Sequence, residues 1–217
     1  MPDIRALLFD LDGTLTHTDP VHLRAFQHLL ADEGLTIDEQ GFQEHVSGQS
    51  NVEIGKRLFP ERTPDAHILL LARKEELFRT YATDLAPIVG VIDFIDAARA
   101  SAMKLALVTN APRDNVGHML AAIRADDRFD TIVYGDEMAR PKPDPLPYLT
   151  GLDRLGVRAS DSLAFEDSVP GIRAAKAAGI FTVGVATTRT EDELRAAGAD
   201  LVVEDFADIR LLPMLGL

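Results

Sequence analysis

Several polar side chains of this sequence stand directly after short apolar runs, or on the loop that follows such a run, where a chain leaving a buried strand can present them to a ligand. Carboxylates can bind a divalent cation, attack an electrophilic centre or transfer a proton, and a hydroxyl or an ammonium can bind an anion. One such position would carry little information, but such groups recur after four successive runs. In chain order they are Asp10 with Asp12, Thr109 with Asn110, Lys142, and Glu166 with Asp167.

The apolar runs predict the strands of a parallel sheet. Each has strand length, and most are apolar throughout instead of alternating, as expected when both faces of a sheet are covered. Because ligands bind at the carboxyl ends of strands in open α/β sheets, we expect the four polar groups to meet at one edge. The predicted strands cover residues 4–9, 105–108, 131–134, 162–165, 182–185 and 201–203.

Segments with helical spacing separate these runs. Their apolar stripes lie within residues 94–103, 116–123, 149–155, 172–178 and 191–197, the third beginning at Leu149. Gly156, Gly179 and Gly198 follow three of these segments, in the position where helices commonly end. The alternation of strand and helix predicts an α/β fold with a Rossmann-like, doubly wound parallel sheet.

One region interrupts this alternation. From about residue 19 to residue 84 the pattern is helical only, with apolar stripes within 23–30, 54–59 and 68–81, the last beginning at Ile68. Glycines and prolines separate the stripes. We therefore predict an all-helical cap domain over residues 17–86, inserted into a core domain formed by residues 1–16 and 87–217.

Composition restricts the partners. The chain has 217 residues, and its 35 acidic and 22 basic residues give a net charge of −13. This balance, without any lysine or arginine run, argues against nucleic acid or an anionic membrane as a partner. The absence of cysteine excludes disulfides and thiolate chemistry. With neither a signal-peptide pattern nor an apolar run of membrane-spanning length, we expect a cytoplasmic protein.

Each motif taken alone has a simpler interpretation. An Asp-x-Asp-Gly sequence is usually a turn or a fragment of a calcium loop. Thr109 is a candidate helix cap, and Glu166 with Asp167 would cap the helix that Pro170 begins. Lys142 alone would be a solvated loop charge. Their recurrence at successive strand ends favours the catalytic interpretation.

Together, Asp10-x-Asp12-Gly13-Thr14, Thr109, Lys142 and Glu166-Asp167 resemble the four motifs of the haloacid dehalogenase-like superfamily, over essentially the whole chain. The resemblance implies that Asp10 attacks phosphorus and that Asp12 protonates the leaving oxygen and later activates water. It implies a Mg²⁺ ion bound by Asp10, the backbone carbonyl of Asp12, and Asp167, with Glu166 bound directly or through water. Thr109 and Asn110 would bind phosphoryl oxygens, and Lys142 would balance the charges.

The second acid separates the reactions of this superfamily. Dehalogenases of the family need the nucleophile but neither a metal nor an acid, and they typically lack the second aspartate. Asp12, Glu166 and Asp167 are all present here, so the resemblance favours phosphoryl transfer. Gly13 would give the backbone the freedom to turn between the two aspartates.

The predicted cap resembles the sugar-phosphatase and β-phosphoglucomutase branch, through the sequence around Asp19–His22 and through Ser47-Gly48-Gln49-Ser50-Asn51. We expect substrate contacts from His22, Gly48, Gln49, Asn51 and Lys74, with Lys56 and Arg57 as weaker candidates. Each of these also has a structural interpretation, such as helix packing for His22 or a polar turn for Gln49 and Asn51. β-Phosphoglucomutases carry an arginine where Asn51 stands, which weakens the mutase interpretation.

The sequence therefore predicts a Mg²⁺-dependent phosphatase acting on a small phosphomonoester, in particular a sugar phosphate. A β-phosphoglucomutase-like mutase and a non-catalytic ligand-binding protein are the alternatives. We expect a monomer, because the inserted cap already covers the site.

Overall fold

A six-stranded parallel sheet forms the centre of the molecule in the computed structural model, which describes residues 4–216. The ends of the predicted core domain, residues 1–3 and 217, lie outside the described residues. The strand order is β3-β2-β1-β4-β5-β6, so the chain winds outward from β1 in both directions. All six predicted strands are present, and the predicted fold class is confirmed. Their bounds are β1 Ala6–Phe9, β2 Lys104–Thr109, β3 Thr131–Tyr134, β4 Ser162–Glu166, β5 Phe181–Val185 and β6 Leu201–Val203.

The register of the central strands brings the polar groups together. Phe9 lies opposite Leu107 on β2 and Phe165 on β4. The residues that follow in these strands, Asp10 after β1 and Glu166 at the end of β4, therefore reach the same edge of the sheet. This convergence follows from parallel pairing and needs no further contact.

Helices cover both faces of the sheet. Leu7 and Phe9 pack with α5, α6 and α10 on one face, whereas Ala6 and Leu8 pack with α7 and α8 on the other. Successive strand residues point to opposite faces, so both sets must be apolar. The helices are α5 Val91–Ala100, α6 Arg113–Ala122, α7 Leu146–Leu155, α8 Val169–Ala177, α9 Glu191–Ala197 and α10 Leu211–Met214, with short 3₁₀ turns at Gly135–Glu137 and Ala159–Asp161.

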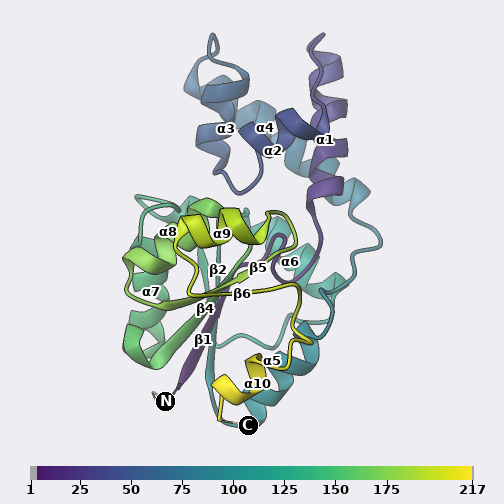
Figure 1. The fold of residues 1–217 in the computed structure, drawn as a ribbon. Coiled ribbons are helices and arrows are strands. Elements are labelled where there is room, and N and C mark those ends of the chain that lie inside the picture. Colours follow the sequence, from purple (N-terminus) through teal and green to yellow (C-terminus); the bar gives the residue numbers. More distant parts are fainter. Residues whose placement is uncertain (1–3, 217) are drawn as a thin grey trace.

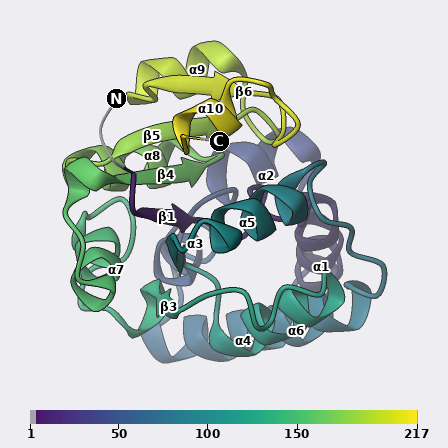
Figure 2. The ribbon, with the colours of Figure 1, turned by 90° about the horizontal axis from the view of Figure 1, so that it is seen from below.

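Four helices between β1 and α5 stand over the carboxyl edge of the sheet (Figure 1), and they lie behind the sheet in the view from below (Figure 2). We call residues 17–86, which contain these helices, the cap segment, and we propose that this segment is the predicted cap domain. Its helices share a hydrophobic cluster that includes Phe26, Phe42, Ile54 and Leu71. Their bounds are α1 Asp19–Asp32, α2 Glu39–His45, α3 Asn51–Leu58 and α4 Pro64–Tyr81.

The two ends of the cap segment are tied to each other. The amide of Ile88 donates to the carbonyl of Leu15 at 2.8 Å, and the hydroxyl of Thr16 donates to the carbonyl of Ala86 at 2.8 Å. Thr16 and Pro87 also form an isolated antiparallel bridge. The segment therefore leaves the α/β part and returns to it at one place.

Two residues that we placed on buried stripes are exposed. Ile68 is 67% exposed and Leu149 is 45% exposed. In α4 the turn that includes Ile68 packs through Leu70, and in α7 the residues Tyr148 and Leu152 carry the packing instead. The spacing of apolar residues predicts which face of a helix is buried, but it does not show how far along the helix a neighbouring element covers that face.

The short helices α2 and α10 were not predicted as separate elements, because they are too brief to show a period. Among the described residues, no helix combines the length and the apolar character that crossing a bilayer requires.

Replacing Phe94 by alanine should lower the free energy of unfolding by about 3–5 kcal/mol, because the cavity left behind cannot be refilled. The Phe94 ring packs against Phe9, Phe165 and Phe206, and the side chain is 3% exposed. Urea unfolding measures the effect. Ile209→Ala, at a position that is 88% exposed, is the control and should change stability by less than about 0.5 kcal/mol. Equal effects of the two substitutions would contradict this packing.

Candidate active site

A cleft lies between the carboxyl edge of the sheet and the cap segment. It encloses about 680 Å³, including its open mouth, which is the size of a site for a small molecule. Residues from β1, β2, the loop after β3 and the loop after β4 form its floor, and residues from α1, α2, α3 and α4 form its roof. The lining includes these residues predicted from the sequence: Asp10, Asp12, Thr109, Asn110, Lys142, Asp167, His22, Gly48, Gln49, Asn51 and Lys74.

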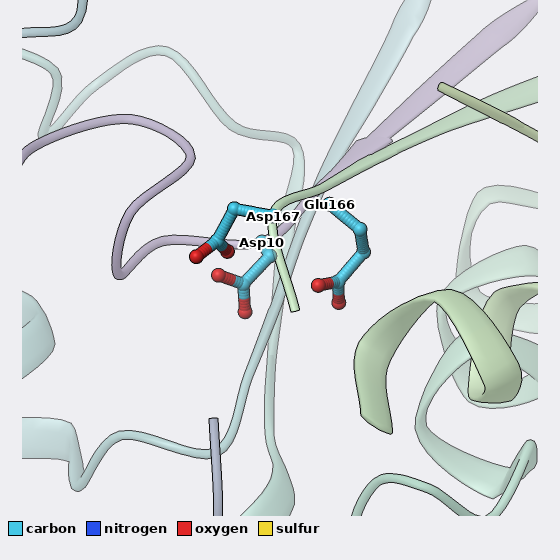
Figure 3. Close-up of side chains that lie close together, drawn as sticks. All are labelled: Asp10, Glu166 and Asp167. Carbon is cyan, nitrogen blue, oxygen red and sulfur yellow. The ribbon is translucent and has the colours of Figure 1, made fainter. Parts of the chain in front are cut away.

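Three buried carboxylates gather at the floor. Asp10, Glu166 and Asp167 each offer an oxygen within 4.8 Å of the others, and they are 8%, 0% and 3% exposed. In Figure 3 the carboxylates of Asp10 and Asp167 lie side by side, and the Glu166 side chain lies on the other side of the strand end with its carboxylate turned back toward them. Gly13 permits this crowding, since its φ is 78° and a Cβ there would lie 2.2 Å from an oxygen of Asp167.

Lys142 provides positive charge within this cluster. Its Nζ donates to Oδ1 of Asp10 at 2.7 Å and also to Oε1 of Glu166, and the side chain is 3% exposed. Oε1 of Glu166 accepts a second hydrogen bond from the Tyr148 hydroxyl at 2.7 Å, and Oε2 accepts one from Ser168 at 3.1 Å. Both oxygens of Glu166 are thus occupied by protein donors, which fits a role one step removed from a bound metal.

The cluster carries more negative charge than Lys142 balances. Burial raises the pKa of Asp10 well above its ordinary value, and the neighbouring carboxylates act in the same direction against Lys142. Burial and then the charge of Glu166 raise the pKa of Asp167 in the same way. Burial alone would lower the pKa of Lys142, but Asp10 and Glu166 outweigh it and raise that pKa. When all three carboxylates are ionised, one ammonium leaves two negative charges in excess, so the donor set fits a divalent cation with oxygen ligands.

Asp12 points toward the cap segment. Its Oδ1 accepts hydrogen bonds from the Thr18 hydroxyl at 2.6 Å and from Nε2 of His22 at 3.1 Å. Burial would raise the pKa of Asp12, but the hydrogen bond from His22, with Thr18 and Lys74, lowers it overall. These contacts favour the carboxylate form of Asp12 while the cleft holds no substrate.

The tautomer of His22 follows from its second neighbour. Nζ of Lys74 lies 3.3 Å from Nδ1 of His22, and an ammonium can only donate, so Nδ1 must accept. The proton on the ring is then on Nε2, from where it is donated to Asp12. The His22 ring also stacks on Phe78 with centroids 4.0 Å apart, so packing and site contact, which we treated as alternatives, both occur.

Thr109 and Asn110 organise the loop after β2. The Thr109 hydroxyl accepts a hydrogen bond from the amide of Ala111 at 2.9 Å, and its side chain is 1% exposed. The Asn110 side chain bonds the backbone of Lys142 in both directions, at 3.3 and 3.4 Å. Asn110 thereby fixes the position of the loop that carries Lys142, in addition to lining the cleft.

The predicted cap residues divide into two groups. His22, Gly48, Gln49, Asn51 and Lys74 all line the cleft. Lys56 and Arg57 do not line it, because they lie on the outer side of α3, where Lys56 pairs with Glu53 and Arg57 bonds the carbonyl of Glu44.

Several residues of the site were missed. Asp19 and Glu75 line the cleft, and Asn115, which is fully buried, donates to Glu75 Oε2 at 2.6 Å. Arg79 donates to the other end of the Asn115 amide at 2.7 Å, so this asparagine joins α6 to α4. In the sequence, Asp19 stands out only as part of the segment that resembles the cap of the sugar-phosphatase branch. For Glu75 and Asn115 the sequence offers no signal beyond a polar residue on a helix.

Comparison with known proteins agrees with this geometry. The chain matches the family model of the haloacid dehalogenase-like hydrolases over residues 7–185. It is 35% identical over 195 residues to protein CbbY of Rhodobacter capsulatus, covering 83% of this chain and 85% of that protein. It is 30% identical over 216 residues to a phosphoglycolate phosphatase of Rhodospirillum rubrum, covering 94% and 89%.

The structural comparison gives the same result. A crystal structure of a CbbY variant from Rhodobacter sphaeroides in complex with xylulose-(1,5)bisphosphate matches with a TM-score of 0.86 at 30% identity, covering 95% of this chain and 96% of that chain. The chain belongs to the haloacid dehalogenase-like hydrolase family. The predictions of the family and of an enzyme with phosphatase relatives are therefore confirmed.

Adding Mg²⁺ should stabilise the folded protein, because a divalent cation offsets the excess charge of the buried carboxylates. With free metal at about 100 times its Kd, the free energy of unfolding should rise by about 2.7 kcal/mol relative to EDTA. Thermal unfolding with and without Mg²⁺ measures this. Asp167→Asn should lose most of the gain, and Asp192→Asn, at an exposed position of α9, should keep it. A gain that persists in Asp167→Asn would place the metal elsewhere.

Proposed function

We propose that this chain is a Mg²⁺-dependent phosphatase that hydrolyses small phosphorylated metabolites, sugar phosphates in particular, through a phosphoryl group carried on Asp10. The observation that supports it most is the buried cluster of Asp10, Glu166 and Asp167 around Lys142, with Asp12 beside it in the same cleft. The relatives support the same class of reaction, because phosphoglycolate phosphatase carries this activity in its name.

In the first step Asp10 attacks phosphorus and the bond between phosphorus and the leaving oxygen breaks. The negative charge of the bound phosphoryl group favours the protonated form of Asp12. Asp12 then supplies the proton that the leaving oxygen takes up, so the departing group is a neutral alcohol. Lys142 stays paired with Asp10 and moderates the charge that gathers on the transferring phosphoryl group. Thr109 and the backbone amides after it bind the phosphoryl oxygens.

In the second step a water molecule attacks the phosphorus of the aspartyl-phosphate. Asp12, which became a carboxylate when it gave its proton to the leaving oxygen and which accepts hydrogen bonds from His22 and Thr18, takes a proton from this water. The bond to Asp10 breaks, which releases phosphate and restores both aspartates. One carboxylate thus acts first as an acid and then as a base.

Asp10, Asp167 and the backbone carbonyl of Asp12 would hold Mg²⁺, with Glu166 acting through water because its oxygens already accept from Lys142, Tyr148 and Ser168. When bound, the ion neutralises phosphoryl charge so that an anionic carboxylate can approach. The cap segment closes the other side of the cleft and keeps bulk water away from the reacting group.

The mutase alternative has less support. A mutase must hold a second phosphate in the cap, and among the described residues no arginine lines the cleft. Asn51, at the position where β-phosphoglucomutases carry arginine, donates to Glu75 at 2.9 Å. A monomeric state and a cytoplasmic location stay predictions from the sequence.

Asp10→Asn should lower phosphate release from sugar phosphates by about 10⁴-fold or more, because the amide is a poor nucleophile. A phosphate-release assay across sugar phosphates, with Mg²⁺ and with EDTA, measures this loss. Circular dichroism should show an unchanged fold, since the substitution preserves shape. Turnover retained in Asp10→Asn would refute the assignment of the nucleophile.

Asp12→Asn should lower kcat by about 10²–10⁴-fold for an alkyl phosphate, because the leaving alkoxide then departs without a proton. The loss in the first step should be much smaller for p-nitrophenyl phosphate, whose leaving group is acidic and needs no proton. Rapid-quench measurement of p-nitrophenol release separates this step from the later hydrolysis. Equal losses for both substrates in that step would show that Asp12 is not the acid.

A further inference from the structure

The charges that line the cleft are predominantly negative. Asp10, Asp12, Asp19, Glu75 and Asp167 line it, against two lysines, Lys74 and Lys142. On the floor, Lys142 and the divalent cation of the proposed function offset the carboxylates. The roof, which would face the leaving group of a substrate, has to be considered separately.

Lys74 is the cation of the roof, and Glu75 neutralises it. Its Nζ lies 2.7 Å from Oε1 of Glu75, and the two side chains are 3% and 6% exposed. Burial would raise the pKa of Glu75, but the charge of Lys74, with further help from His22 and Asn51, lowers it overall. The pair therefore stays ionised and carries no net charge.

The other N–H groups of the Lys74 ammonium also have partners. Its Nζ bonds Nδ1 of His22 at 3.3 Å and lies 5.0 Å from the centre of the Phe26 ring. An ammonium has three N–H groups, and these neighbours together with Glu75 account for them. An anion could bind Lys74 only by displacing a buried partner.

Three arginines on segments around the cleft are engaged with other protein groups. Arg113 follows Pro112, which lines the cleft, but its guanidinium bonds Glu137 at 3.0 and 2.7 Å and stacks over Tyr134 at 4.0 Å. Arg79 donates to Asn115. Arg189 donates to the carbonyl of Gln43 at 2.6 Å.

The polar groups that face a leaving group suit hydroxyls. Asp19 adds a second carboxylate to the roof, where its Oδ2 accepts from Gln43 at 2.9 Å and Ser47 at 3.1 Å. Gln49 adds an amide that both donates and accepts. A hydroxyl or an ammonium can donate to these carboxylates, whereas a carboxylate or a second phosphate would meet charge of its own sign in a poorly hydrated space.

We propose, on the basis of the function proposed above, that the roof of the cleft selects phosphomonoesters whose leaving group is an uncharged or amine-bearing polyol, and that Glu75 is the residue that excludes anionic leaving groups. Phosphoglycolate and sugar bisphosphates, which carry a carboxylate or a second phosphate, are then poor substrates. This would separate the chain from the phosphoglycolate phosphatase that it resembles and from the CbbY variant that was crystallised with xylulose-(1,5)bisphosphate.

A matched set of six-carbon substrates tests the selection. Sorbitol 6-phosphate and 6-phosphogluconate differ by one group, a hydroxymethyl in place of a carboxylate, and glucosamine 6-phosphate adds a positive charge to glucose 6-phosphate. The wild-type protein with Mg²⁺ should show kcat/KM for sorbitol 6-phosphate at least about 10-fold above that for 6-phosphogluconate. Glucosamine 6-phosphate should be hydrolysed at least as well as glucose 6-phosphate.

Two substitutions assign the selection to the roof. Glu75→Gln keeps the shape but frees the charge of Lys74, so the preference for sorbitol 6-phosphate over 6-phosphogluconate should fall by about 10-fold. Glu76→Gln, one residue further along α4 and exposed, is the matched control and should leave the preference unchanged. Asp19→Asn should reduce the preference in the same direction, which keeps the test valid if Glu75→Gln proves unstable on thermal unfolding.

The outcomes distinguish the two proposals. Efficient hydrolysis of 6-phosphogluconate, phosphoglycolate or fructose 1,6-bisphosphate by the wild-type protein would overturn the selection and leave the phosphatase intact. A preference that persists in both Glu75→Gln and Asp19→Asn would overturn its assignment to these residues. Failure to release phosphate from any phosphomonoester would overturn the proposed function itself, and the selection with it.

Discussion

Repulsion among three buried carboxylates is the constraint on which this site depends. Asp10, Glu166 and Asp167 lie within a few ångströms of one another in a place that water scarcely reaches. Such charges are tolerated only when they are paired and hydrogen-bonded. Lys142, Tyr148, Ser168, Thr14 and Thr188 supply these contacts. The parallel sheet holds the acids together against their repulsion, and this stored electrostatic cost is what makes the site receptive to a cation.

The cap segment contacts the floor of the cleft directly. Lys74 on α4 contacts His22 on α1, and His22 contacts Asp12, two residues from Asp10. Glu75 and Arg79 on α4 also reach Asn115 on α6. The orientation of Asp12 therefore depends on both ends of the cap segment and on its contact with the α/β part.

Much of this arrangement could be predicted from the sequence, because its determinants are local. Each strand appears as a short apolar run, and parallel pairing then places Asp10, Thr109 and Glu166 at one edge, which the loop after β3 reaches with Lys142. The roof could not be predicted to the same depth. Glu75 and Asn115 acquire their importance only when α4 packs against α6, and nothing in the spacing of either helix specifies that contact. Ile68 shows the same limit, since its stripe continues past the point where a neighbouring helix covers it.

The tie between Leu15–Thr16 and Ala86–Ile88 has a consequence for how such chains diversify. It closes a loop of about 70 residues at its base. Contacts outside the cap segment offset the entropic cost of closing this loop, and that cost rises only slowly with the length of the insert. Sequence between these two points can be lengthened, shortened or replaced while the sheet edge keeps its geometry. Ligand preferences can thus change when the cap segment is exchanged, while the cluster of buried carboxylates at the sheet edge stays as it is.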